Sequence, residues 1–259
     1  MSKNVIYYFS GTGNSLKAAK DIAAVIGDTR LAFMTENAAE LCGEYDRIGF
    51  VFPCYAGGAP AIVLNFIRNL KTECAEIGYI FAVVTCNVSV GNSFYAVRKA
   101  LAAKGLELGY CGGSQAPGNY VIEYPIEKDA PQKIKRADEA FARFAADIQN
   151  KSLNSNGKLL NPFFALFYRI GQRFFKMMEK RFRVTEDCVS CGLCAKLCPV
   201  GNIEITDGKP VFLHKDCASC LACLHWCPRA AIECGQATVK HGRYRHPSIT
   251  PKDMTENRN

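Results

Sequence analysis

Residues 5–16 read VIYYFSGTGNSL, and this stretch decides the interpretation of the first half of the chain. Its first five residues are apolar and strand-forming. A loop follows in which hydroxyl residues alternate with glycines, and residues 14–26 then have a helical pattern. We therefore predict a strand, a tight loop and the N-terminus of a helix in direct succession.

The loop at residues 10–15 has the composition of an anion site. Hydroxyl and backbone N–H groups at a helix N-terminus can surround a phosphate without a lysine. Leu16 stands where a dinucleotide fingerprint has its third glycine, and no P-loop Gly-Lys-Ser/Thr follows. A terminal monophosphate such as that of FMN therefore suits the loop better than a pyrophosphate; the alternative is a turn that binds nothing. The candidate residues are Ser10, Gly11, Thr12, Gly13, Asn14 and Ser15.

Around this stretch, residues 1–150 alternate short apolar runs with helical patterns, which is typical of a parallel sheet with crossover helices. Residues 80–84, IFAVV, suit a central strand buried on both faces. We predict an α/β domain with a five-stranded, doubly wound parallel sheet. The expected strands are residues 5–9, 30–34, 47–52, 79–85 and 106–112, and the expected helices are residues 14–26, 60–70, 93–103 and 131–150.

A doubled cysteine pattern marks the second half. The spacing C-x2-C-x2-C-x3-C-P occurs at residues 188–199 and again at residues 217–228, so this region is an internal repeat. Three cysteines on one loop can hold three irons of a [4Fe–4S] cube, while the fourth reaches across to the other cube. The predicted ligands are Cys188, Cys191, Cys194 and Cys227 for one cluster and Cys217, Cys220, Cys223 and Cys198 for the other.

Zinc and disulfides are the competing interpretations of the cysteines. Structural zinc favours two C-x2-C pairs with a longer spacer, whereas these are runs of four. The chain begins directly with a strand-like run and shows no secretory signal, so we expect it to stay in the reducing cytoplasm without disulfides. Iron–sulfur clusters are thus preferred, as the main source of stability of a region this small. The six remaining cysteines occur singly: Cys42, Cys54, Cys74, Cys86, Cys111 and Cys234.

The net charge of +8 is unevenly distributed. Residues 1–150 carry fifteen basic and fifteen acidic residues, whereas residues 151–187 carry eight and three. We predict four parts: a sheet domain at 1–150, a linker and amphipathic helix at 151–183, a cysteine-rich domain at 184–236, and a flexible, basic polar tail at 237–259. The helix at 162–183 either docks between the two domains or lies on an anionic membrane. Nothing spans a membrane, and no basic nucleic-acid module is visible.

Residues 184–236 resemble a bacterial two-[4Fe–4S] ferredoxin, and the 10–15 loop resembles the phosphate loop of flavodoxins. Together they are similar to the ferredoxin-fused flavodoxins of anaerobic bacteria and archaea. The resemblance implies FMN on a flavodoxin-like sheet, with Ser10, Thr12 and Ser15 as hydroxyl positions. It also implies two further FMN loops, with residues Pro53, Cys54, Tyr55, Ala56 and Gly57 in one and Thr85, Cys86, Asn87 and Gly91 in the other.

Tyr55 is expected to stack on the flavin. The loop at 85–92 has no aromatic residue, which would leave one flavin face open to a substrate or a cluster. The loop at 116–120 either approaches the same edge or is a surface turn. Redox roles for Cys54 and Cys86 are not expected, since buried or loop thiols are usually inert.

No acid–base constellation is visible, because all four histidines lie outside the FMN domain and His225 is expected to pack in the core. The cofactors would therefore carry the chemistry. The preferred hypothesis is an electron carrier between redox proteins, whose clusters and FMN pass electrons to a partner enzyme. The alternative is an FMN-dependent reductase of a small acceptor such as a quinone or an activated alkene, and a redox sensor or adaptor is the third. Whether the protein is itself an enzyme stays open.

Overall fold

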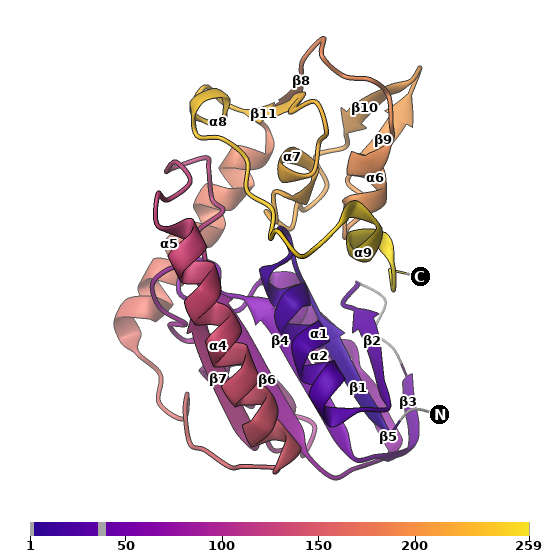
Figure 1. Cartoon of the computed structure of the whole chain (residues 1–259), viewed down its shortest axis with the longest axis vertical. Coiled ribbons are helices and arrows are strands. Elements are labelled where there is room, and N and C mark those ends of the chain that lie inside the picture. Colours follow the sequence, from indigo (N-terminus) through magenta and orange to yellow (C-terminus); the bar gives the residue numbers. More distant parts are fainter. Residues whose placement is uncertain (1–2, 36–39, 259) are drawn as a thin grey trace.

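The computed structural model of the chain describes residues 3–35 and 40–258. Residues 1–2 and 36–39 of the predicted sheet domain, and residue 259 of the predicted tail, lie outside the described part. A sheet domain and a cysteine-rich region are stacked along the long axis of the molecule (Figure 1). Within the described residues, no helix combines the length and apolar character needed to cross a bilayer.

Five parallel strands form the central sheet, in the order β2-β1-β4-β6-β7. This is the 2-1-3-4-5 order of flavodoxin-like folds, in which the strand order reverses between β1 and β4. The predicted fold class is therefore confirmed. The bounds are β1 (Asn4–Tyr8), β2 (Thr29–Phe33), β4 (Arg47–Pro53), β6 (Ile80–Cys86) and β7 (Tyr110–Gln115).

Helices cover both faces of this sheet. On one face α1 (Asn14–Ile26) packs against α4 (Ala130–Gln149), and on the other α2 (Ala61–Asn69) packs against α3 (Ser93–Ala102) (Figure 1). Every residue of β6 is buried, as expected for a central strand covered on both sides. Strand β7 begins later than predicted, because Leu106 closes the end of α3 by donating its N–H to the Leu101 carbonyl.

Two strands that the sequence did not indicate form a separate parallel pair, β3 (Glu40–Tyr45) and β5 (Lys71–Ile77). Most of their residues are partly or fully exposed. Their pattern therefore lacks the buried apolar face on which prediction of a strand depends.

The cysteine-rich region consists of short elements. Strand β8 (Phe182–Val184) pairs with β11 (Ile232–Cys234), β9 (Ile203–Thr206) pairs with β10 (Lys209–Phe212), and α6 (Leu193–Leu197) contacts α7 (Ala222–His225). The internal repeat recurs in the backbone. Equivalent residues of the two copies share left-handed conformations, in the pairs Ser190 and Ser219, Gly192 and Leu221, and Gly201 and Ala230.

The prediction of a flexible tail is wrong. Residues 237–258 form α8 (Ala237–Lys240), which packs on β11, and α9 (Pro251–Thr255), which lies at the junction of the two regions (Figure 1). The side chains of Tyr244, Ile249 and Met254 are buried there. The tail has few apolar residues, and these three are buried although its polar composition gave no sign of it.

One long helix, α5 (Pro162–Glu179), connects the two regions. It begins with Asn161 as its cap, whose side chain accepts the N–H of Phe163. It ends earlier than the predicted helix at 162–183, since strand β8 begins at Phe182.

Candidate functional site

The glycine-containing loop after β1 lies at the carboxyl edge of the sheet, at the reversal of strand order, where open α/β sheets bind ligands. Ser10, Thr12 and Ser15 are almost fully buried. Within the described chain, the backbone N–H groups of residues 11, 12, 14, 15 and 16 have no acceptor, while the N–H of Gly13 donates to Ser10 Oγ at 3.1 Å. These buried donors form a cradle that fits a phosphate dianion.

Polar side chains hold this cradle in place. Ser15 Oγ lies 2.8 Å from Thr85 Oγ1, Asn119 Nδ2 donates to Thr12 Oγ1 at 2.9 Å, and Tyr244 OH donates to Asn14 Oδ1 at 2.7 Å. Because Thr12 Oγ1 accepts from Asn119, its own proton stays free to donate to an anion. The loop at 116–120 therefore does approach the predicted site.

The other two predicted FMN loops meet at the same edge. The N–H of Cys54 donates to the Thr85 carbonyl at 2.7 Å, and the N–H of Asn92 donates to the Gly57 carbonyl at 2.8 Å. Gly91 lies so close to Gly57 that a Cβ on Gly91 would collide with the Gly57 carbonyl. All three loops are thus brought together at the carboxyl ends of β1, β4 and β6.

Other parts of the chain cover the loops at 57–59 and at Gly11, whereas the loop at 85–92, which we expected to leave one face open, borders a cavity. Phe164 and Tyr168 of α5 contact Gly57 and Gly58, and the Tyr168 hydroxyl donates to the Ala59 carbonyl at 2.9 Å. The Cys217–Cys223 loop covers Gly11, as described below. What remains open is a cavity of about 810 Å³, including solvent-exposed space, lined by Cys86, Gly91 and their neighbours.

Tyr55 lies at the centre of this covered site. Its ring contacts Phe9 and Phe175 edge-on, with centroids 6.2 Å apart in each pair, and the Tyr120 ring lies 5.2 Å from Phe175. The hydroxyls of Tyr55 and Tyr120 are buried without a partner in the described chain. Such unpaired groups are costly unless a ligand satisfies them, so they fit a polar cofactor edge.

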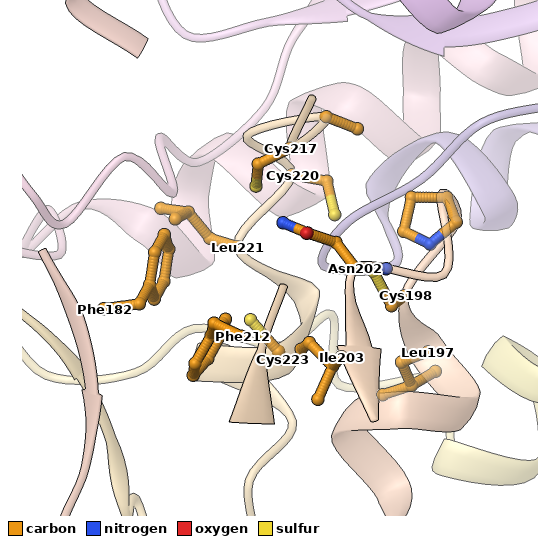
Figure 2. A pocket seen from close by; sticks show the side chains of 12 residues that line it. Phe182, Leu197, Cys198, Asn202, Ile203, Phe212, Cys217, Cys220, Leu221 and Cys223 are labelled. Atoms are coloured by element: carbon orange, nitrogen blue, oxygen red, sulfur yellow. The ribbon is translucent and has the colours of Figure 1, made fainter. Parts of the chain in front are cut away.

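The eight clustered cysteines surround two cavities of about 360 and 370 Å³ of atom-free space. We name the one lined by Cys188, Cys191, Cys194 and Cys227 the first cysteine site. The second cysteine site is lined by Cys198, Cys217, Cys220 and Cys223, and Figure 2 shows the sulfur atoms of the last three turned toward the cavity. The structure thus brings together the two groups of four that the sequence assigned.

Burial keeps these thiols protonated unless a positively charged centre is bound beside them. Burial and the neighbouring Cys220 thiol raise the pKa of Cys217 to about 12, and burial raises that of Cys194 to about 11. Four such thiols around one cavity become thiolates when a metal centre balances their charge. Backbone N–H groups also point at sulfur in both copies, from Asn202 to Cys198 Sγ at 3.1 Å and from Ala231 to Cys227 Sγ at 3.2 Å. The donor sets fit iron–sulfur clusters.

The second cysteine site lies directly on the phosphate cradle. A Cβ on Gly11 would collide with the carbonyl oxygen of Cys220. Trp226, buried beside the predicted ligand Cys227, donates its indole N–H to the Gly11 carbonyl at 2.9 Å. By contrast, Cys191 of the first cysteine site is exposed. The second site is therefore the inner one and the first the outer one.

Several residues of this junction could not be found from the sequence. Asn202 is buried and donates to Glu179 Oε1 at 3.0 Å, which joins α5 to the second cysteine site. Trp226 reaches the cradle only through the fold, whereas Asn119 belongs to the loop at 116–120 that the sequence offered as a neighbour of the site. His225 does pack in the core, with Nε2 2.7 Å from the Asn119 carbonyl oxygen and Nδ1 accepting from the Tyr244 N–H at 3.1 Å. No spacing in the sequence relates these residues to residues 10–15.

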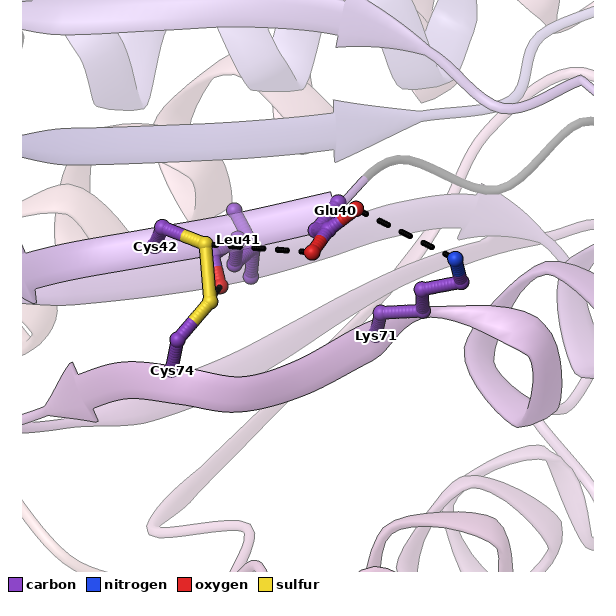
Figure 3. The surroundings of a disulfide bond; sticks show 5 residues. All are labelled: Glu40, Leu41, Cys42, Lys71 and Cys74. Atoms are coloured by element: carbon purple, nitrogen blue, oxygen red, sulfur yellow. Dashed lines mark hydrogen bonds and ion pairs between the residues drawn. A yellow bond between two sulfur atoms is a disulfide. The ribbon is translucent and has the colours of Figure 1, made fainter.

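The expectation that the single cysteines form no disulfide is wrong for one pair. Cys42 and Cys74 face each other in the β3–β5 ladder with Cα atoms 4.7 Å apart and are joined by a disulfide (Figure 3). They are thirty-two residues apart in the sequence, so only the strand pairing reveals them. Cys86 remains a thiol whose pKa burial raises to about 12, in keeping with the inert role expected of it.

Comparison with known proteins assigns the cysteine-rich region. Residues 175–232 match the family model of the 4Fe-4S dicluster domain. No curated protein matches the chain. A flavodoxin-like sheet domain joined to a 4Fe-4S dicluster domain is the combination that the sequence resembles.

Solved structures similar to the chain cover its N-terminal part. They include a protein from Bacteroides uniformis assigned provisionally as a flavoprotein (20% identity, 44% of this chain, 90% of that one, TM-score 0.35). A flavodoxin of Streptococcus pneumoniae is 15% identical, over 56% of this chain and 97% of that one, with a TM-score of 0.34. The rubredoxin oxygen:oxidoreductase of the anaerobe Desulfovibrio gigas is 17% identical, over 56% of this chain and 36% of that one, with a TM-score of 0.35. These similarities are low, so the fold assignment rests on the strand order.

Proposed function

We propose that this chain, a flavodoxin-like domain joined to a 4Fe-4S dicluster domain, is an iron–sulfur flavoprotein that carries electrons between two [4Fe–4S] clusters and FMN and hands them to a partner redox enzyme. The observation that carries the proposal is the contact of Cys220 and Trp226 with Gly11, which joins the second cysteine site to the phosphate cradle. In a protein where the two sites had separate roles, nothing would require this contact.

The chain's residues have distinct roles in this proposal. The cradle would hold the FMN phosphate through the free N–H groups of residues 11, 12 and 14–16 and the hydroxyls of Ser10 and Thr12. The buried hydroxyls of Tyr55 and Tyr120 would satisfy polar atoms of the ring system. FMN, when bound, supplies a centre that exchanges one or two electrons, and the clusters exchange one each.

The burial of the two cysteine sites supports an order for the clusters. The first site reaches the surface at Cys191, so it is placed to meet a protein partner. In the second site none of the four cysteines is exposed, and the buried Cys220 contacts the cradle. We propose the first site as the port for external electrons and the second as the relay to the sheet domain.

One observation favours the alternative, an FMN-dependent reductase of a small acceptor. The cavity beside Cys86 and Gly91 is open and borders a predicted FMN loop. A molecule such as a quinone or an activated alkene could enter there. The carrier is preferred because the remaining sides of the site are enclosed by protein and no described acid–base group lines this cavity.

Anaerobically purified protein tests the proposal, by its FMN and iron content and by the FMN content of Thr12→Asp. The added carboxylate stands inside the cradle and should repel the phosphate, so FMN should fall at least about ten-fold while iron is unchanged. Thr206→Asp, on exposed strand β9, adds the same charge as a control and should keep both. Equal FMN in Thr12→Asp and the parent would refute the phosphate site.

A stepwise anaerobic reduction, monitored by visible absorbance, distinguishes the electron carrier from the reductase. A carrier should show the flavin taking up electrons one at a time alongside the clusters. A reductase should show two-electron uptake and should oxidise again on addition of a small acceptor. Protein that contains iron but no flavin would overturn the proposed function of the sheet domain.

A further inference from the structure

Helix α5 carries a stripe of large apolar side chains that lies outside the protein core. Phe163, Leu166, Ile170 and Met177 are between 59% and 69% exposed, and Phe167 is 49% exposed. The stripe continues before the helix with Leu159, which is 88% exposed. Scattered apolar residues are normal on a surface, but a contiguous ridge of this kind marks a binding surface.

The stripe is separate from the face by which α5 is fixed to the protein. That face carries Phe164, Tyr168, Gly171 and Phe175, which contact the 55–59 loop, and it ends at the buried Glu179. At about 100° per residue, the packed face and the stripe occupy different sectors of the helix. The predicted broad apolar side is thus divided between a face that docks and a face that does not.

Basic residues occupy the sector on one flank of the stripe: Arg169, Arg173, Lys176 and Lys180, all exposed. Among them, Lys176 alone has an ion pair in the described chain, 3.5 Å from Asp216, and both of those side chains are largely in solvent. The sequence has no Asp or Glu between residues 148 and 178. The helix therefore presents three cationic side chains, Arg169, Arg173 and Lys180, that no ion pair of the described chain neutralises.

An anionic lipid surface is the occupant that fits both features. Helices that lie in the lipid–water interface place Phe and Leu among the acyl chains and Lys and Arg among the headgroups. The rings of Phe163 and Phe167 stack with an interplanar angle of 2° and form one flat apolar edge. A second copy of the chain would instead bring a like-charged flank against its own.

We propose that α5 docks this protein on the surface of membranes that contain anionic lipids, with the stripe inserted and the basic flank at the headgroups. The docking leaves the cysteine sites and the phosphate cradle intact, because those contact other faces of α5 and other elements. This proposal does not depend on the electron-transfer proposal, so either one can be refuted while the other stands.

Sedimentation of the full, iron-loaded protein with lipid vesicles tests the docking. Binding should be strong to vesicles of phosphatidylcholine with phosphatidylglycerol, weak to phosphatidylcholine alone, and weakened by added salt. Parent protein that does not bind the phosphatidylglycerol vesicles, or that instead self-associates through this face in analytical ultracentrifugation, overturns the proposal.

Two triple variants locate the surface. Phe163→Ser/Leu166→Ser/Ile170→Ser removes exposed apolar area, and Arg169→Glu/Arg173→Glu/Lys180→Glu reverses the flank. Each should weaken partitioning at least about ten-fold, with unchanged cluster absorbance as the check on folding.

The matched control is Lys135→Glu/Arg136→Glu/Arg143→Glu, which makes the same charge change at exposed positions of α4. It should reduce binding by less than about three-fold, since only long-range attraction is lost. An equal loss in the control and in the α5 charge variant would show general charge attraction and refute a docking face on α5. Undiminished binding of the serine variant would refute insertion of the stripe.

Discussion

The sheet domain and the cysteine-rich region obtain their stability in different ways. The sheet domain has a core of fully buried aromatic and aliphatic side chains, among them Phe50, Phe81 and Phe141. The second core is small and consists of Val121, Ile122, Met178, Leu221, Leu224, Ile232 and Cys234. Three of these residues, Val121, Ile122 and Met178, come from outside the predicted 184–236 domain.

The difference shows what each region requires in order to fold. Helices of four or five residues and strands of three or four cannot persist on local preference alone. The cysteine-rich region therefore depends on metal centres and on apolar residues from the loop after β7 and from α5. Most residues of the larger core belong to the sheet domain itself, so we expect that domain to fold without them.

Removal of iron should produce the largest difference in stability between the two regions. Anaerobic chelation should release the protection of backbone amides in residues 184–236 against hydrogen exchange, while β6 should stay protected. Protection that is lost equally in β6 and β9 would show that the two regions unfold as one unit and would contradict the distinction.

The crossed ligand assignment predicts the next largest effect. Cys198→Ala should remove about half of the iron, and the double variant Cys198→Ala/Cys217→Ala should lose no more, because both residues serve the second cysteine site. The variant Cys198→Ala/Cys188→Ala should lose nearly all. Cys234→Ala, a buried cysteine outside both sites, is the control and should keep its iron. The reverse pattern for the two double variants would overturn the pairing.

A core substitution in the sheet should act on that region alone. Phe81 is fully buried and its ring packs on Gly49, so Phe81→Ala should lower the free energy of unfolding by roughly 3–5 kcal/mol without changing the iron content of the folded protein. The same change at exposed Phe163 should cost less than about 0.5 kcal/mol. Denaturant unfolding measures both, and similar costs would contradict the description of the core.

The smallest effect concerns the tail. Burial lowers the pKa of His246, with Asp138 and Asp21 opposing and Lys17 adding to the shift. The folded protein therefore takes up this proton at a lower pH than the unfolded chain does. The stability that depends on neutral His246 is complete above its ordinary pKa of about 6.5 and decreases as the pH falls toward the folded pKa. The melting temperature should fall less in His246→Gln than in the parent protein between about pH 7.5 and 5.5, and the two falls should differ by at most about 4 °C. An unchanged slope would exclude His246 as its source.

Local signals were enough to predict the strand, loop and helix at residues 5–26 and both cysteine runs. Helix α1 has its predicted bounds, because the glycine loop and the apolar spacing of the helix both lie in the sequence. The 29-residue repeat likewise determines which cysteines share a site, since each half contributes three ligands and exchanges the fourth.

Tertiary packing decided the features that prediction missed. Strands β3 and β5 are mostly polar and, within the described residues, pair with each other alone, and the Cys42–Cys74 disulfide depends on that pairing. Tyr244 and Met254 are isolated apolar residues whose burial requires the surface of the other region. The amphipathic pattern of α5 predicted one apolar side, but it could not show how much of that side the protein covers.

Arg258 makes the two regions hard to separate by engineering. Its guanidinium lies over the Phe33 ring, 3.9 Å from the centroid, and donates to the Leu197 carbonyl at 2.6 Å. Phe33 ends β2 in the sheet domain, whereas Leu197 directly precedes the predicted ligand Cys198. Residues 184–236 grafted onto another protein would therefore lack Arg258, whose side chain holds the end of α6. A transferred cysteine-rich region must therefore include the tail and the surface of the sheet domain that the tail contacts.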